Sequence, residues 1–209
     1  MSSVHVVVYV ESELGFHPLG SSTIAETALA RAASADCSPK LSLWVAAGVT
    51  VPATVRDRAR AHFTIATDVD LATYASQCDA EFVLLHDAQR PLTQPDTFDR
   101  VVDALVAGAV AARPSHVVVD TLKVVDNDFR ITGTVNRDEV MSLTSPEGYK
   151  KSALNGEVGD VWLLNFAGEH EYVRGDLESL RVRVPEDVLL VESFLIWQVI
   201  EAKAETEKS

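Results

Sequence analysis

The chain has 209 residues, which is enough for one well-buried domain and makes a second full domain unlikely on size alone. Hydrophobic residues make up 47% and charged residues 23%, the balance of an ordinary globular protein. The 18 lysines and arginines face 31 aspartates and glutamates, a net charge of -13, which disfavours nucleic acid as a partner. Any phosphate ligand must therefore be held by local cations against an unfavourable overall field.

The two cysteines, Cys37 and Cys78, lie far apart and show neither metal-ligand spacing nor a disulfide framework, which favours a reducing compartment. The N-terminus has no basic region followed by an apolar core and a cleavage site. No apolar run approaches the length of a membrane span. We therefore expect a cytoplasmic protein with no membrane contact.

The first half of the chain alternates apolar runs with helical patterns. Residues Val4–Val10 form a nearly continuous β-branched run, which predicts a central parallel strand buried on both faces. A polar connection over 11–20 follows, and Ser21 or Ser22 is expected to cap a helix over Ile24–Ala33. The later pattern predicts strands at 41–47, 63–66 and 82–85, and helices at 52–60 and 68–78.

The strand at 82–85 runs directly into polar residues, His86 and Asp87, with Arg90 close behind. In an open α/β sheet, ligands bind beyond the carboxyl ends of the strands. An aspartate there can hold a divalent cation or a ribose hydroxyl, and an arginine can pair with phosphate in a two-pronged geometry. The alternative interpretation is structural: Asp87 caps a turn and Arg90 pairs with it.

The second half continues the alternation and then departs from it. A helix is expected over 96–111, followed by a strand over 116–119 that ends at Asp120. The helix has apolar residues at helical spacing, namely Phe98, Val101, Val102, Leu105 and Val106. Strands and helices in this order predict a doubly wound, three-layer α/β fold with a mostly parallel sheet.

Residues 123–135 instead predict a hairpin with Asn127 and Asp128 at its turn. A lone hairpin is marginal in water, so this arm must bury its apolar face, and a partner subunit is one solution. The remaining pattern predicts a helix start at 145–147, a helix at 158–166, short strands at 172–173 and 180–182, a last helix from Pro185 to about 202, and a frayed end over 203–209.

Four separated motifs occur in one order along the second half of the chain. They are HDAQRPL at 86–92, DTLK at 120–123, a stretch at 134–149 that opens with TVNR and closes with SPEGY, and a stretch at 173–187 that opens with VRG and closes with PED. This set resembles the 2-C-methyl-D-erythritol 4-phosphate cytidylyltransferase family. Its pattern reads HDAARP, DTLK, an arginine eight residues before TPQ, and a lysine four residues before PEDL.

The resemblance implies a nucleotidyltransferase-like, Rossmann-like fold in a single domain over 1–209, with a β-arm at 122–144 used for homodimerisation. It also implies a reaction of the non-mevalonate isoprenoid pathway. The phosphate of methylerythritol phosphate attacks the α-phosphate of CTP with the help of Mg²⁺, and CDP-methylerythritol and pyrophosphate are formed. Catalysis of this kind relies on positioning and charge neutralisation.

The resemblance also implies roles for individual residues. Asp87 would contact the metal and the ribose, with His86 beside it in the nucleotide site. Arg90 would face the phosphate or the sugar. Arg181 stands where the family has lysine and would be catalytic with Asp87, although a guanidinium fork is not an ammonium point charge.

Thr121, Arg137 and Ser145 would hold methylerythritol phosphate, with Arg137 supplied across the dimer by the arm. Ser145 stands where the family has threonine, so the hydroxyl is kept. The structural alternatives are a turn or cap role for Thr121 and Ser145, pairing of Arg137 with its acidic neighbours at 138–139, and a solvated strand face for Arg181.

The N-terminal half departs from the family at the nucleotide-binding loop. A glycine-rich loop with arginine and lysine is expected after the first strand, because its N–H groups and cations hold the triphosphate. Residues 11–20 read ESELGFHPLG, with no lysine or arginine. They place Glu11 and Glu13 there, and like charges about 4 Å apart repel by about 4 kcal/mol at an effective dielectric constant near 20. His17 is mostly uncharged at neutral pH.

A second nucleotide element, GGxxRxxS in the family, is also absent from 66–75. Both losses fall on the nucleotide, while the motifs for the sugar phosphate are mostly kept. The sequence therefore supports two hypotheses. One is an enzyme, either a divergent cytidylyltransferase or a nucleotidyltransferase with another donor. The other is a catalytically inactive paralogue that binds a phosphorylated small molecule or a partner subunit. The absence of GxGxxG after the first strand disfavours a dinucleotide-binding oxidoreductase.

Overall fold

The computed structural model describes residues 2–154 and 170–206. The first part contains β1 (Val4–Val10), η1 (Glu13–Phe16), β2 (Pro18–Leu19), β3 (Ser22–Thr23), α1 (Ile24–Ala33), β4 (Lys40–Val45), α2 (Ala53–His62), β5 (Thr64–Ala66), α3 (Leu71–Gln77) and β6 (Phe82–Asp87). The second part contains α4 (Pro95–Ala107), β7 (Ala111–Val117), β8 (Lys123–Val125), β9 (Ile131–Thr134), η2 (Arg137–Glu139), β10 (Met141–Leu143), β11 (Glu147–Lys150), η3 (Lys151–Ala153), β12 (His170–Arg174) and α5 (Asp187–Thr206).

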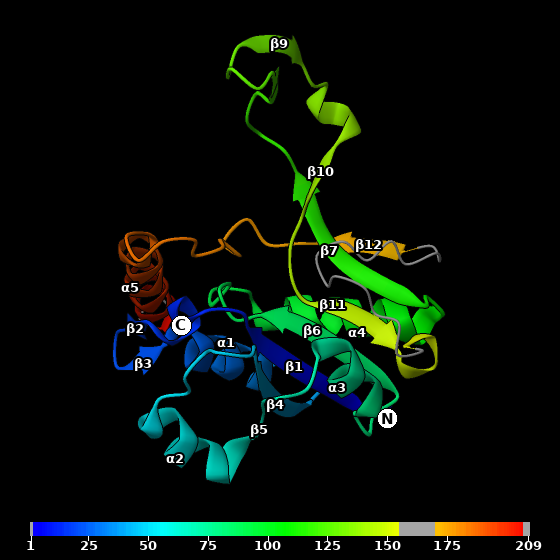
Figure 1. The fold of residues 1–209 in the computed structure, drawn as a ribbon, viewed down its shortest axis with the longest axis vertical. Helices are drawn as coiled ribbons and strands as arrows, with labels where there is room; N and C mark the ends of the chain where they lie inside the picture. Colours follow the sequence, from blue (N-terminus) through cyan, green and yellow to red (C-terminus); the bar gives the residue numbers. More distant parts are fainter. Residues whose placement is uncertain (1, 155–169, 207–209) are drawn as a thin grey trace.

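An eight-stranded sheet runs through the described residues in the order β10-β7-β11-β6-β1-β4-β5, with β12 paired to β7 (Figure 1). β1 pairs in parallel with β4 and β6, β5 with β4, and β12 with β7. β10 and β11 are the antiparallel members. The predicted doubly wound, mostly parallel α/β fold is therefore confirmed.

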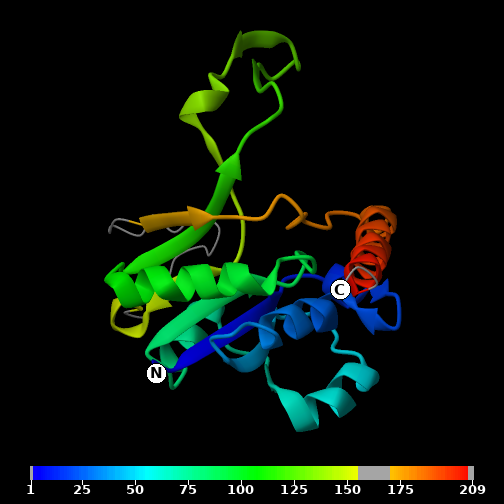
Figure 2. The same cartoon turned by 180° about the vertical axis from the view of Figure 1, so that it is seen from behind.

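Helices cover both faces of this sheet. Figure 2 shows α1 and α4 on one face, and Figure 1 shows α3 on the other. β1 contributes to both cores: Val6 and Val8 pack in the cluster that contains the α1 and α4 side chains, whereas Val7 packs with those of α3. All three valines have no exposed surface. The prediction of a central strand buried on both faces is confirmed, which explains its unbroken β-branched run.

The first helix begins at the predicted residue but has a different cap. Thr23 is the N-cap of α1, and its hydroxyl accepts a hydrogen bond from the Glu26 backbone N–H at 3.2 Å. The Glu26 carboxylate in turn accepts one from the Thr23 N–H at 2.9 Å. This reciprocal capping box satisfies two N–H groups at once. Ser22 lies instead in the short strand β3, so neither Ser21 nor Ser22 has the predicted role.

The boundary between α4 and β7 lies earlier than predicted. The helix ends at Ala107, and Gly108 follows with φ of +126°, a conformation that favours glycine. The strand then starts at Ala111 and ends at Val117, so Asp120 does not end a strand. Of the five predicted core positions on α4, four are buried, but Val106 is 61% exposed.

The predicted helix start at 145–147 is wrong. Residues Glu147–Lys150 form β11, which pairs antiparallel with β6 and with β7. In this position their backbone groups bond to two neighbouring strands, and those long-range partners are not visible in the local helix-start pattern. Gly148 lies where the strand passes closest to α4: a Cβ built on it would lie 2.3 Å from Cγ1 of Val101.

Gly148→Ala is therefore expected to lower the free energy of unfolding by about 2 kcal/mol, because the added methyl overpacks the core against α4. Gly133→Ala, in the arm, is the matched control, since its Cβ would meet only Val124 at 3.8 Å. Its effect should stay within about 0.5 kcal/mol. Urea unfolding measures both, and equal effects would contradict the packing argument.

Four other expectations concern the C-terminal part. No strand forms at 180–182 in the described chain; this segment lies instead beside the residues that follow β6, with the Val182 N–H donating to the Gln89 carbonyl at 2.8 Å. The strand at 172–173 is confirmed within β12, and α5 continues to Thr206, beyond the predicted end. The helix expected at 158–166 lies outside the described residues. None of the described helices has the length and hydropathy needed to span a bilayer.

The predicted hairpin is present and projects away from the sheet (Figure 1). β8 and β9 form its two-stranded end, while β10 connects it back to the sheet through β7. Its apolar side chains are uncovered in the single chain: Val124 is 48%, Phe129 87% and Ile131 67% exposed. The apolar surface of the arm is therefore available for contact with another molecule.

Candidate functional site

The carboxyl ends of β1 and β6 lie next to each other at one edge of the sheet. The two strands are parallel neighbours, with Tyr9 in register with Asp87. The chain leaves β1 towards Glu11 at the same edge where β6 ends in Asp87. The strand ends of this α/β sheet therefore bring together the acidic residues that the sequence places after two different strands.

Asp87 is held by the protein through both carboxylate oxygens. Its side chain is 2% exposed. Oδ1 accepts a hydrogen bond from the Gln89 backbone N–H at 2.9 Å, and Oδ2 accepts one from Nε of Arg181 at 2.7 Å. Oδ2 also lies 3.8 Å from Nε of Arg90. The structural interpretation of Asp87 as a turn residue paired with Arg90 is thus confirmed, with Arg181 as a stronger partner.

Arg181 lies between three acceptors from distant parts of the chain. Besides Asp87, its Nη2 donates to Oε2 of Glu11 at 3.2 Å and to Oε1 of Gln89 at 3.3 Å. Burial opposes its charge, but the carboxylates of Asp87 and Glu11 outweigh this and raise the pKa of Arg181. Arg181 is therefore not the solvated strand residue of the structural alternative.

Arg90 mainly supports the segment that carries Arg181. Its Nη1 donates to the backbone carbonyl of Ser179, and its side chain is 14% exposed. Burial lowers the pKa of Arg90, against the attraction of Asp87. Its Nε has no hydrogen-bond partner among the described residues. In this arrangement Arg90 holds the segment that begins at Ser179 close to the end of β6 through a hydrogen bond.

Ser145 and His86 form the buried support beneath Asp87. The Ser145 hydroxyl lies 2.8 Å from Nδ1 of His86 and accepts the backbone N–H of Asp87 at 2.9 Å. Ser145 is 4% exposed and His86 has no exposed surface. His86 was predicted to bind the nucleotide, but its ring packs against Phe98 with centroids 4.9 Å apart, so it lies inside the core and does not face a ligand at the strand ends.

Burial, with a smaller effect from Arg90, lowers the pKa of His86 to about 3. The unfolded imidazole takes up a proton near pH 6.5, so the unfolded state binds more protons between these values. Stability should therefore be full above pH 6.5 and fall as the pH drops towards 3. Between pH 7 and 5 the wild type is expected to lose roughly 2 kcal/mol more than His86→Asn in urea unfolding. Equal losses would show that His86 does not set this dependence.

The segment after β1 forms a compact structure of its own where the family pattern has its triphosphate loop. η1 (Glu13–Phe16) places Oε1 of Glu13 2.7 Å from the backbone N–H of Thr50, which donates to it. A Cβ on Gly15 would lie 2.7 Å from Cγ1 of Val10, so this glycine permits packing against β1. Residues 11–20 are thus held in place by contacts within the chain, without a ligand.

Four charged side chains in contact with one another at these strand ends carry no net charge among them. We call Glu11, Asp87, Arg90 and Arg181 the Arg181 cluster; it contains two carboxylates and two guanidinium groups. A triphosphate needs an excess of positive charge, since each phosphate oxygen must exchange water for a cation or an N–H group. In this arrangement Arg181 is already paired with carboxylates on two sides.

Two predicted site residues lie apart from the cluster within one chain. Thr121 is an exposed residue just before β8, and Arg137 lies in η2, between β9 and β10. Nη1 of Arg137 donates to the backbone carbonyl of Val119 at 2.9 Å, which differs from the pairing with its acidic neighbours that we considered. The described fold therefore does not bring Thr121 or Arg137 to Asp87 in the same chain.

The fit of a divalent metal to Asp87 is incomplete. Mg²⁺ is commonly bound through one or two carboxylates together with substrate phosphates. Asp87 supplies one carboxylate, but both of its oxygens already accept hydrogen bonds. No group of three or more metal-ligating side chains occurs among the described residues. A cation at Asp87 would have to compete with Arg181 and would depend on a phosphate ligand for its other oxygens.

Two residues of this site were not assigned a role from the sequence. Gln89 stands where the family pattern has alanine, and its Nε2 donates to the Val182 carbonyl at 2.5 Å while its Oε1 accepts from Arg181. A polar residue in place of alanine within this motif is the feature of the sequence that could have indicated a role for Gln89. From the sequence, Glu11 is expected only to repel a phosphate ligand. Its bond to Arg181 joins positions 170 residues apart, which no local pattern reveals.

The comparisons with known proteins agree with the fold and the motifs. The model of the family described as IspD, 2-C-methyl-D-erythritol 4-phosphate cytidylyltransferase, matches residues 63–196. The enzyme of that name from Nocardia farcinica is 34% identical over 137 residues, which cover 62% of this chain and 60% of the relative. The one from Frankia casuarinae is 33% identical over 126 residues, covering 56% and 47%. The alignments thus span about half of these relatives.

Solved structures show the same fold over nearly the whole chain. The 2-C-methyl-D-erythritol 4-phosphate cytidylyltransferase of Thermus thermophilus has a TM-score of 0.75 at 20% identity, covering 93% of this chain and 99% of that one. A CMP:2-keto-3-deoxy-manno-octonic acid synthetase complexed with CTP has a TM-score of 0.70 at 10% identity, covering 94% and 100%. The family match begins at residue 63, after the divergent loop. On the family model, the motifs and the fold, this chain belongs to the 2-C-methyl-D-erythritol 4-phosphate cytidylyltransferase family.

Proposed function

We propose that this chain retains the acceptor side of a cytidylyltransferase. It would bind methylerythritol phosphate, or a polyol phosphate like it, without transferring a cytidylyl group from CTP. The observation that carries the proposal is the contact of Arg181 with Glu11 at 3.2 Å and with Asp87 at 2.7 Å. This arginine stands at the family's lysine position, and here carboxylates of the chain itself take the place of a phosphate.

The donor side lacks the means to hold a triphosphate. Cytidylyl transfer depends on neutralising the charge that develops on the leaving pyrophosphate. Residues 11–20 contain no lysine or arginine, and Glu11 and Glu13 add two negative charges. These features support a loss of CTP binding.

The acceptor side keeps its residue types in the family's order. Thr121, Arg137 and Ser145 match the positions that hold methylerythritol phosphate in the family pattern. Ser145 acts here by supporting the end of β6, since its hydroxyl bonds to His86 and to the Asp87 N–H. Thr121 and Arg137 are exposed and accessible to a ligand or to a second copy.

The chain is proposed to work as a homodimer of single-domain subunits joined through the arm at 122–144. The exposed apolar side chains of Val124, Phe129 and Ile131 support this, because an isolated hairpin with an uncovered apolar face is marginal. The dimer would carry Arg137 of one subunit to the strand ends of the other. Neither nucleic acid nor a membrane is part of the proposal.

Calorimetric titration of the purified chain tests both sides separately. We expect heat on addition of methylerythritol phosphate and none on addition of millimolar CTP with Mg²⁺. A parallel assay for pyrophosphate release with all three components should show no turnover. An active family member serves as the control. CTP binding with turnover would overturn the proposal, and absence of binding to methylerythritol phosphate would remove its acceptor half.

Cytidylyl transfer from CTP to methylerythritol phosphate with Mg²⁺ is the second candidate. It is favoured by the retained contact between Asp87 and Arg181, the two predicted catalytic residues. An incoming triphosphate would then have to displace Glu11 from Arg181. In that case pyrophosphate release should require all three components and should be lost in Asp87→Ala.

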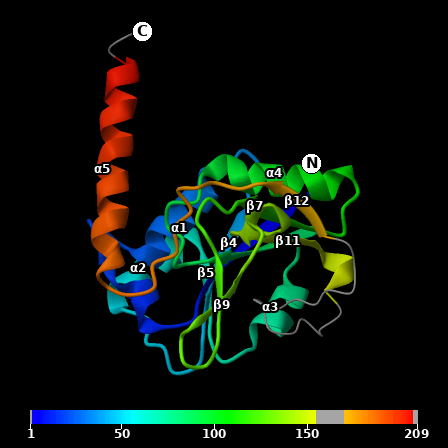
Figure 3. The ribbon, with the colours of Figure 1, turned by 90° about the horizontal axis from the view of Figure 1, so that it is seen from above.

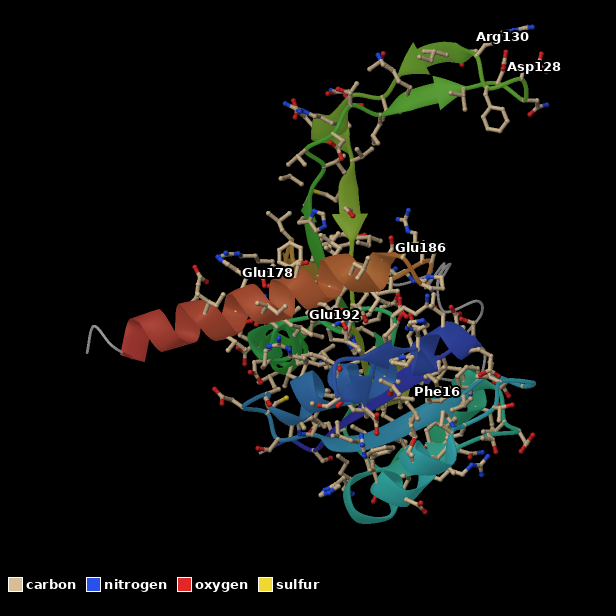
Figure 4. All side chains as sticks on the ribbon, turned by 90° about the vertical axis from the view of Figure 1, so that its left-hand side faces the viewer. Phe16, Asp128, Arg130, Glu178, Glu186 and Glu192 are labelled. Atoms are coloured by element: carbon tan, nitrogen blue, oxygen red, sulfur yellow. The ribbon has the colours of Figure 1, made fainter. Side chains whose placement is uncertain are left out.

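Arg137→Ala is expected to weaken binding of methylerythritol phosphate by about tenfold to a hundredfold, because a charge-assisted contact to phosphate is lost. Arg130→Ala is the matched control: it removes the same charge from the same arm, where Arg130 pairs only with exposed Asp128 at 3.3 Å among the contacts described (Figure 4). Titration of the two variants compares them directly. Similar weakening in both would indicate a general charge effect and not a contact by Arg137.

A further inference from the structure

The last helix, α5, is apolar on two opposite faces. One face packs on the domain in a core cluster beside β2, α1 and the end of β6. Its members from α5 are Val188, Val191, Phe194 and Leu195, and those from the domain include Leu19, Ile24 and Leu92. This face attaches the helix to the body together with hydrogen bonds from the Gly20 N–H to Glu192 and from Arg31 to Gln198, and none of these contacts uses the apolar residues on the other side.

The opposite face carries a second row of apolar side chains. Leu189, Ile196 and Ile200 are its apolar members, and the small polar Ser193 completes a spacing of four, three and four residues, with Trp197 beside them. We call these five residues the α5 stripe. Leu189 is 71%, Ile196 62%, Ile200 59% and Trp197 45% exposed. Figure 3 shows the C-terminal part of α5 extending beyond the body of the domain.

An exposed apolar stripe of this kind is expected to be covered by a binding partner. Large contiguous apolar patches are uncommon on monomeric proteins and mark interaction surfaces. An anionic membrane surface is disfavoured by the net charge of -13. The arm of the same chain projects in another direction from α5 (Figure 4) and leaves this face uncovered. The intervals of four, three and four are those of a helix that pairs with another helix.

We infer that the occupant is the α5 of a second copy, packed antiparallel. The stripe is self-complementary about a point between residues 194 and 195. In an antiparallel pair centred there, Leu189 lies opposite Ile200, and Ser193 lies opposite Ile196. Each layer then combines residues from the two alternating positions of the seam, which is the layer pattern of an antiparallel pair, and the contact uses the same surface on both copies.

The charges at the ends of the stripe fit the same register. Glu186 precedes the helix, and Lys203 follows the stripe within it. The antiparallel register places position 186 of one copy opposite position 203 of the other at both ends. A parallel pair would instead place Glu186 next to Glu186. Charge thus favours the arrangement that the apolar spacing selects.

Sedimentation of the full-length chain tests this contact. Ile196→Glu is expected to lower the mass of the wild-type assembly at micromolar concentration, to that of the monomer if α5 makes the only contact and to that of the arm-linked dimer if the arm makes a second one. Val106→Glu is the matched control, because Val106 is equally exposed, at 61%, on α4. A mass that stays unchanged in Ile196→Glu overturns the inference. Binding of the wild type to uncharged lipid vesicles, lost in Ile196→Glu without a change in mass, would assign the stripe to a membrane and also overturn it.

Cross-linking with a short bismaleimide tests the orientation. By the helical rise of 1.5 Å, residue 193 lies about 4.5 Å along the axis from its symmetry mate, and residue 203 about 26 Å. Ser193→Cys should therefore cross-link between copies and Lys203→Cys should not. The wild type, with Cys37 and Cys78, gives the background. Efficient cross-linking at both positions would indicate a parallel pair. Arm variants and ligand titrations leave this result unaffected, so it is separable from the proposed function.

Discussion

Asp87→Ala is expected to lower the free energy of unfolding by about 3 kcal/mol, the largest stability effect among the polar residues of the site. The substitution leaves Arg90 and Arg181 without the carboxylate that neutralises them. The cost is large because Asp87 is 2% and Arg90 14% exposed, so water replaces little of the lost interaction. Arg181, at 26% exposed, recovers part of it through solvent and Glu11.

Asp128→Ala provides the control for this prediction. Asp128 also pairs with an arginine, Arg130, but both side chains are more than two-thirds exposed, at 69% and 76%. Exposed pairs contribute little, so the loss should stay below about 0.5 kcal/mol. Urea unfolding of both variants at pH 7 makes the comparison. If both lose the same small amount, Asp87 is not the charge partner that holds the two arginines.

Glu11→Gln is expected to strengthen binding of inorganic pyrophosphate by about fivefold to tenfold, which corresponds to roughly 1 kcal/mol for a partly exposed ion pair. Glu11 and Arg181 are 39% and 26% exposed, so their attraction is partly screened by solvent. Removing this carboxylate frees one side of the guanidinium and gives the Arg181 cluster an excess positive charge. Pyrophosphate is the probe because it is the part of CTP that the loop must hold.

The matched variant is Glu13→Gln, two residues along the same segment. It removes the same charge, but Glu13 accepts its hydrogen bond from the Thr50 N–H and not from Arg181. We expect less than a twofold change in its affinity for pyrophosphate. Calorimetric titration of the two variants shows whether the specific contact of Glu11 with Arg181 or the overall negative charge of the loop limits the affinity for pyrophosphate. Equal gains would mean that the acidic loop acts through its overall charge, and that the Glu11 contact has no special role.

Several features of the fold were predictable from local pattern. The run Val4–Val10 indicated a doubly buried strand, the residues at 123–135 indicated a hairpin, and the alternation of elements indicated the α/β class. Each of these depends on the period of apolar residues or on turn chemistry, which are local properties. The wrong helix start at 145–147 arose because Pro and Glu also suit that role, whereas pairing with β6 and β7 decided the outcome.

The candidate site divides in the same way. The sequence by itself placed Asp87 and Arg90 at the end of a buried strand, supplied the family's motifs, and showed that residues 11–20 carry acids in place of cations. Only the tertiary structure decided that His86 and Ser145 lie beneath the site as support, and that Arg181 reaches both Asp87 and Glu11. The reason is physical: periodicity records which face of an element is buried, but contacts between residues 11, 87 and 181 depend on which strands become neighbours.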